Sequence, residues 1–176
     1  MNSLTKTAKF FLYVFVASGA IWLGSYITRL SAFYQLFQAT EFTLKEFVNN
    51  QNIAGIFQTL IATVSINLIF YLLMIVAFIL FVITSKLNLK HNGWLFISLV
   101  LILLTAPFEF YLMLIDYKII MIVLNEGFNP QDVLNLVIKR FTILSSFPIV
   151  EILSYFAIIY LFLFQPLSGT RKRLAE

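Results

Sequence analysis

The chain has 176 residues, of which 61% are hydrophobic and only 11% are charged. A typical soluble domain carries about 25% charged residues, so this composition leaves too little polar surface for a water-soluble fold and predicts one small membrane domain. The mean hydropathy of +0.94 agrees with that class.

The residue types that are missing exclude several kinds of chemistry. With no cysteine and one histidine, the chain cannot form disulfides, thiolate metal sites, Fe–S clusters or two-histidine haem ligation. The net charge of +4 could indicate nucleic acid, but no soluble domain is there to present a basic face. We therefore expect no nucleic-acid partner, no metal and no cofactor, and we interpret the lysines and arginines as determinants of membrane topology.

Four apolar runs predict an all-α integral membrane protein with four transmembrane helices. The first run follows Lys6 and Lys9, a pattern shared with signal peptides, but it is long enough to span a bilayer. Its small residues predict a close helix contact, and Trp22 and Tyr26 suit the outer interface. The predicted spans are 10–28, 58–84, 94–115 and 147–165, and the small residues are Ala17, Ser18, Gly19, Ala20 and Gly24.

The two longer loops are each predicted to contain an interfacial amphipathic helix. In the first loop, Thr43 and Glu46 have the spacing of a capping box. In the second, Asn129 and Pro130 form a strong helix start, and residues 119–124 could extend the third span. The predicted apolar faces comprise Phe33, Phe37, Leu44, Phe47 and Val48 in the first loop and Val133, Leu134, Val137, Ile138, Phe141 and Leu144 in the second.

Charge asymmetry predicts the orientation. Basic residues are concentrated in the amino end, the short turn and the carboxyl tail, which the positive-inside rule assigns to the cytoplasm. We therefore expect a multi-pass protein of the cell inner (plasma) membrane with both termini cytoplasmic. The concentrated residues are Lys6, Lys9, Lys86, Lys90, Arg171, Lys172 and Arg173, and the dispersed ones are Arg29, Lys45, Lys118, Lys139 and Arg140.

The two outer loops resemble each other, which raises the hypothesis of an internal duplication. Residues 42–49 match residues 128–135 at a constant offset. Each half, 10–84 and 94–165, would then consist of a span, an interfacial helix and a span, as in parallel-repeat membrane proteins. Apolar sequences also align by chance, so one domain of 1–176 without a repeat is the alternative.

Four polar residues are predicted to form one layer in the outer leaflet. Counting inward from the outer interface at 1.5 Å per residue puts Asn67, Glu109 and Glu151 within about 10 Å of the surface, and Arg29 could bridge the two glutamates. Such a layer could be structural, because polar residues join membrane helices. It could also bind a proton, a cation or a lipid headgroup, or contact a partner's membrane helix.

Catalysis has little support in the sequence. A Ser–His–Asp relay would need His91, which is predicted on the side opposite the outer-loop acids. Asp116 and Asp132 could form an aspartate pair, but Asp132 is already explained by the helix start. We therefore do not expect an enzyme.

The function expected from these features is that of a non-catalytic accessory or assembly subunit of a larger membrane complex. It would pack through apolar helix faces and the outer-loop helices, and a hetero-complex is favoured over a homo-oligomer. The alternative is a small homo-oligomeric transporter or channel that uses Glu109 and Glu151 as a proton or cation site. Other expected partners are lipids, with Arg171, Lys172 and Arg173 contacting anionic headgroups.

Overall fold

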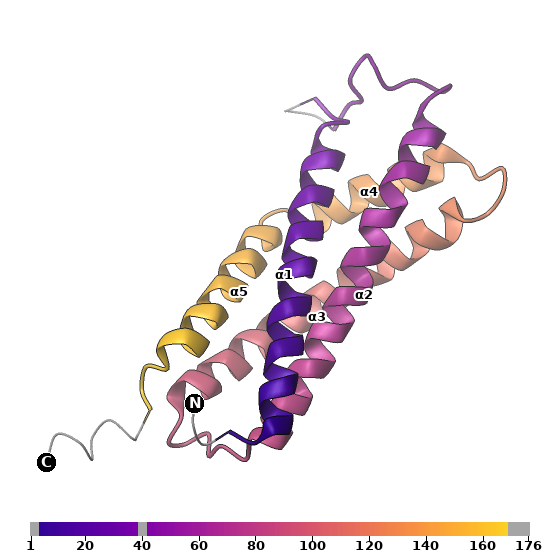
Figure 1. The fold of residues 1–176 in the computed structure, drawn as a ribbon. Helices are drawn as coiled ribbons and strands as arrows, with labels where there is room; N and C mark the ends of the chain where they lie inside the picture. Colours follow the sequence, from indigo (N-terminus) through magenta and orange to yellow (C-terminus); the bar gives the residue numbers. More distant parts are fainter. Residues whose placement is uncertain (1–3, 39–41, 169–176) are drawn as a thin grey trace, which may run out of the picture. The chain divides into compact units, whose positions relative to one another are not determined.

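The computed structural model describes residues 4–38 and 42–168 and, within them, contains five helices and no strand beyond two isolated bridges (Figure 1). Four of the helices are long and apolar enough to cross a membrane, which confirms the predicted all-α class and the four spans. The helices are α1 (Lys6–Tyr34), α2 (Ile53–Ser85), α3 (Gly93–Val123), α4 (Pro130–Ile143) and α5 (Phe147–Phe164).

Most of the helices extend beyond the apolar runs that predicted them. α1 continues to Tyr34 and α3 continues to Val123, because backbone hydrogen bonding does not depend on where the hydrophobic stretch ends. Gly127, with φ of 71°, follows the end of α3, at the left-handed position that glycine adopts without steric cost. α5 lies within a residue of its predicted bounds.

α4 begins where the sequence predicts. The Asn129 side chain accepts a hydrogen bond from the amide of Gln131, and Pro130 occupies the first turn. The face containing Val133, Val137 and Phe141 is buried. The helix is thus amphipathic, whereas its place at a membrane surface stays a prediction.

The predicted helix of the first loop is wrong, because residues 42–52 contain no helix. Phe37 and Leu44 instead form an antiparallel bridge, in which the Lys45 amide donates to the Leu36 carbonyl at 2.9 Å. This pairing takes up backbone groups next to Thr43 and Glu46, the two residues of the expected capping box. The effective cap is Asn49, whose side chain accepts from the amide of Asn52 immediately before α2.

The chain folds into two compact units. Unit 1 comprises Met1–Gly19, Leu73–Phe110 and Ser146–Glu176, and unit 2 comprises Ala20–Leu72 and Tyr111–Ser145. Each unit draws on both halves of the sequence, so the units are not the two proposed repeats. The duplication stays a prediction.

The core of unit 1 is aromatic. The Phe162 ring lies 5.5 Å from Phe15, 5.5 Å from Phe81 and 5.1 Å from Trp94. A Cβ atom at Gly19 would overlap the Tyr155 ring, and the Tyr155 hydroxyl donates to the Val16 carbonyl at 3.2 Å. The predicted close contact at Gly19 is therefore present, and it joins α1 to α5.

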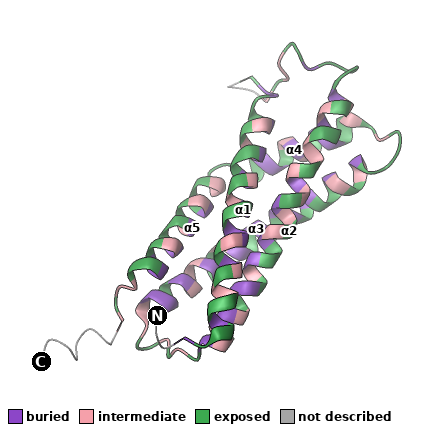
Figure 2. Ribbon diagram, viewed as in Figure 1, coloured by how far each residue is buried: buried purple, intermediate pink, exposed green. Residues whose placement is uncertain are grey.

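The outward faces of the spanning helices are apolar. Figure 2 shows exposed residues along all four of these helices, as expected where lipid or another membrane helix replaces water. Examples of exposed large side chains are Tyr13 on α1, Ile69 on α2, Leu104 on α3 and Leu163 on α5.

Candidate functional site

Three charged side chains in unit 2 form a buried cluster, which we call the Asp116 cluster. Arg29 Nη1 lies 2.5 Å from Asp116 Oδ2, and Arg140 Nε lies 2.8 Å from Asp116 Oδ1. All three side chains are at least 95% buried. The cluster joins α1, α3 and α4, because each of these helices supplies one of its members.

Helical spacing explains how Arg140 enters this cluster. Arg140 follows Val133 and Val137 by seven and three residues, which puts all three on one face of α4. That face is buried, and Phe141 beside it packs on Tyr34 with ring centroids 4.7 Å apart. Burial of the apolar side chains on this face therefore places Arg140 in the interior of unit 2, where Asp116 supplies its counter-charge.

Tyr26 provides an aromatic contact for both guanidinium groups. Its ring centroid lies 5.0 Å from Arg29 Cζ and 5.9 Å from Arg140 Cζ. A cation over an aromatic face is stabilised by about 2 kcal/mol or more when desolvated. The sequence predicts Trp22 and Tyr26 at the outer interface. Both are instead buried, so they pack in the interior of unit 2.

The arrangement favours a structural role for Asp116. Both of its carboxylate oxygens accept from arginines. Removing one partner of a buried ion pair usually costs about 3–5 kcal/mol, because a charge is left uncompensated. Asp116 thus holds three helices together. Because Asp116 is bound by two arginines and Asp132 is exposed, the arrangement does not favour an aspartate pair between these two residues.

Asn67 makes a second polar contact within unit 2. Its amide nitrogen donates to the Trp22 carbonyl and to Ser25 Oγ, each at 3.3 Å. The residue is fully buried, so it joins α2 to α1 as hydrogen-bonding residues between membrane helices do. Of the predicted layer, Asn67 and Arg29 therefore both lie in the interior of unit 2, with separate partners.

The two glutamates of the predicted layer belong to unit 1. Glu109 on α3 and Glu151 on α5 are buried, with exposed fractions of 0% and 3%. The described residues contain no group of three or more metal-ligating side chains. The bridge from Arg29 to these glutamates stays a prediction, and Arg171, Lys172 and Arg173 lie outside the described residues.

One exposed face of α1 is formed by small residues. Ala20, Gly24 and Thr28 are exposed and follow one another at intervals of four residues. A Cβ added at Gly24 would meet no atom within 4 Å. We call these residues the α1 small-residue strip. The sequence predicted a close contact for Ala20 and Gly24, and the structure turns them away from the interior of unit 2.

No protein-family model, curated protein or solved structure matches this chain. The site must therefore be interpreted from its own geometry. Sequence reasoning missed Asp116 as the partner of Arg29, and it missed Arg140 as the second arginine that binds Asp116. For Arg140 a signal was present, because it occupies the apolar face of α4 at helical spacing.

Proposed function

We propose that this chain is a non-catalytic subunit of a larger membrane complex and that it binds a partner's transmembrane helix through the α1 small-residue strip. Small residues four apart let two helix backbones approach closely in a membrane, where van der Waals packing drives association. The exposed positions of Ala20, Gly24 and Thr28 are the observation that carries this proposal.

The outward face of α5 provides the contrast. Its exposed residues include Ile149, Leu153, Phe156 and Tyr160, which are bulky side chains suited to contact with lipid tails. Bulky side chains keep a neighbouring helix at a distance, whereas the strip on α1 allows close approach, so this contrast favours a protein neighbour for α1.

The other expected contact surface is less suitable for a partner. The apolar face of α4 packs within unit 2, where Phe141 contacts Tyr34 and Phe33. The proposal therefore moves the docking surface from the outer-loop helices to α1. It retains a hetero-complex in the inner membrane, with both termini in the cytoplasm.

The proposal is tested by filling the strip. Gly24→Leu should prevent close approach of a partner helix, so co-purifying membrane proteins should be lost in gentle detergent while the chain remains folded. Ala157→Leu is the matched control, because Ala157 is also an exposed small residue but lies on α5, among bulky exposed side chains. The readouts are the identity of co-purifying proteins and the particle mass.

Two results would contradict this assignment. Retention of the partners by Gly24→Leu would show that α1 is not the docking surface. A homo-oligomer without other proteins, purified from native membranes, would contradict the hetero-complex and direct attention to transport.

The alternative function is a small transporter or channel. The specific observation in its favour is the deep burial of Glu109 and Glu151, since intramembrane carboxyl groups often mark proton or ion pathways. Under this alternative, Glu109→Gln and Glu151→Gln would abolish pH- or ion-dependent flux in liposomes without loss of folding. A subunit would remain assembled with both substitutions.

A further inference from the structure

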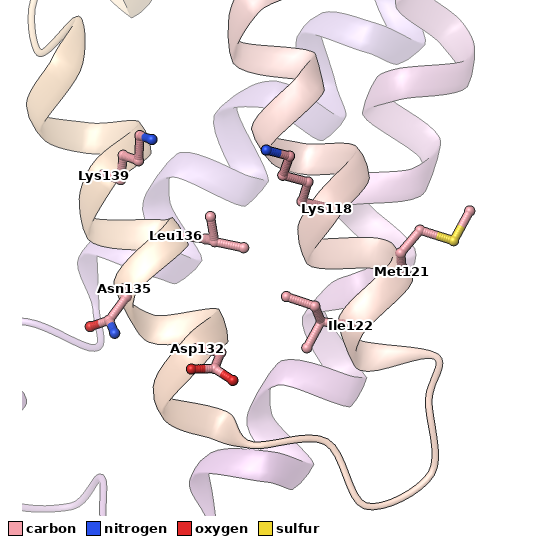
Figure 3. Close-up of a pocket in the computed structure, with 7 residues that line it drawn as sticks. All are labelled: Lys118, Met121, Ile122, Asp132, Asn135, Leu136 and Lys139. Carbon is pink, nitrogen blue, oxygen red and sulfur yellow. The ribbon is translucent and has the colours of Figure 1, made fainter.

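A pocket of about 470 Å³, which we call the α3–α4 pocket, lies between these two helices and entirely within unit 2. Its wall is mostly apolar and includes Met121 and Ile122 of α3 and Leu136 of α4. Figure 3 shows Ile122 and Leu136 pointing toward each other across the space between the helices. The buried face of α4, which contains Val137 and Phe141, is a different one. The pocket can therefore take a ligand while α4 remains packed in unit 2.

The pocket lies beyond the part of α3 that fits inside a bilayer. α3 has 31 residues, which is about 46 Å at 1.5 Å per residue, whereas the hydrocarbon core of a bilayer is about 30 Å thick. The apolar run that ends at Ile115 is long enough to fill this core by itself. Residues 116–123 are therefore expected to project from the core, and the pocket lies along this projecting part.

The charged and apolar groups follow a fixed order along the pocket. Lys118 of α3 and Lys139 of α4 lie at the end nearer the apolar run of α3. Ile122, Leu136 and Asp132 lie on the loop side of the lysines, with Asp132 near the α3–α4 loop (Figure 3). A phospholipid with its phosphate at the lysines would have to direct its acyl chain out of the membrane. The order therefore favours a ligand that approaches from the aqueous side.

Both kinds of group are available to such a ligand. Lys118 and Lys139 are exposed, and neither ammonium group forms an ion pair or donates a hydrogen bond within the described part of the chain. Met121 is 46% exposed. Apolar surface with a polar rim often marks a protein contact, and methionine adapts its shape to a partner.

We propose that the α3–α4 pocket binds an extramembrane segment of a protein partner. An acidic side chain of this segment lies between Lys118 and Lys139, and a large apolar side chain packs on Ile122 and Leu136. The order of charges puts the acid on the membrane side of the apolar residue and disfavours a second acid near Asp132. The inference rests on the proposed function, and it adds a contact outside the membrane to the one at the α1 small-residue strip.

The first test is photo-cross-linking in native membranes, with benzoylphenylalanine in place of Met121. We expect one partner protein to cross-link through a segment outside its own membrane spans that combines an acidic residue with a large apolar one. The matched control has benzoylphenylalanine in place of Tyr117, which is also exposed on α3 but does not line the pocket. Its yield for this segment should be much lower.

The second test measures binding of a synthetic peptide with the cross-linked sequence to the purified full chain. An exposed ion pair contributes up to about fivefold to an affinity, so Lys118→Gln with Lys139→Gln should weaken binding by about 2- to 25-fold. Lys118→Arg with Lys139→Arg keeps both charges and should bind as wild type does. Lys118→Glu with Lys139→Glu should bind well only after the acid of the peptide is changed to lysine. Leu136→Trp fills the apolar space and should abolish binding.

Several outcomes would overturn the proposal. A cross-link from position 121 to a phospholipid, or to a second copy of this chain, would show a different occupant. A cross-linked segment without an acidic residue, or equal peptide binding by wild type and the glutamine variant, would contradict the charge match.

The two proposals can also fail separately. If Gly24→Leu releases the partners but position 121 cross-links to no protein, the α3–α4 pocket is not a docking site and the proposed function stands. If wild type purifies from native membranes without any partner, both proposals are wrong.

Discussion

Unit 2 contains two groups of charged residues, each with two cations and one aspartate, in different environments. The Asp116 cluster has two arginines and an aspartate, all buried. The α3–α4 pocket is lined in part by Lys118, Lys139 and Asp132, all exposed. The groups are adjacent in sequence, because Asp116 and Lys118 share α3 and Lys139 and Arg140 share α4.

The difference shows that the position of a charged residue around the helix axis decides whether its side chain is buried or exposed. Neighbouring residues on a helix point about 100° apart, so Arg140 is on the buried face of α4 while Lys139 lines the pocket. The chemical type agrees with the place. Arginine suits buried pairing with a carboxylate because its guanidinium is planar and weakly hydrated, whereas the strongly hydrated ammonium of lysine suits the surface.

The largest expected effect comes from removing the shared acid. Asp116→Ala should lower the free energy of unfolding by about 3–5 kcal/mol, because it leaves two buried arginines without their counter-charge. Thermal unfolding in detergent measures this loss. Asp132→Ala is the matched control and should have a much smaller effect, since it removes only an interaction with the N-terminus of α4. Equal losses in the two variants would contradict the distinction between the two groups.

A smaller effect is expected when the two kinds of cation are exchanged. Arg140→Lys keeps the charge but loses the Nε hydrogen bond to Asp116, and we expect a loss of about 1–3 kcal/mol in unfolding free energy. Lys139→Arg should leave the free energy of unfolding close to that of wild type, because Lys139 is exposed. If Arg140→Lys were as stable as wild type, the geometry of the buried pair would not matter.

The smallest effect concerns salt. Raising ionic strength from about 0.1 M to about 1 M shortens the screening length from about 10 Å to about 3 Å. The unfolding temperature should change little, because the Asp116 cluster is buried and its ion pairs are screened weakly. A large decrease of the unfolding temperature in high salt would contradict the burial of the cluster.

The sequence alone determined the class of this protein and much of its secondary structure. Four long apolar runs predict spanning helices because a bilayer leaves helical hydrogen bonding as the way to satisfy each backbone group in such runs. The Asn129 cap predicted the start of α4, because such a signal acts within one turn of chain. Gly19 was predicted to lie at a close contact for a similar reason, since only a small residue fits there.

The tertiary structure decided which charges meet. Arg29 and Asp116 are far apart along the chain, and a single sequence contains no information on which acid a given arginine will face. The prediction of a helix in the first loop was wrong for a related reason. Its pattern fits an amphipathic helix, but the Phe37–Leu44 bridge satisfies the backbone groups that such a helix would use. Likewise, the burial of Arg140 depends on Asp116 being beside it, because only a nearby counter-charge makes an arginine stable in an apolar interior.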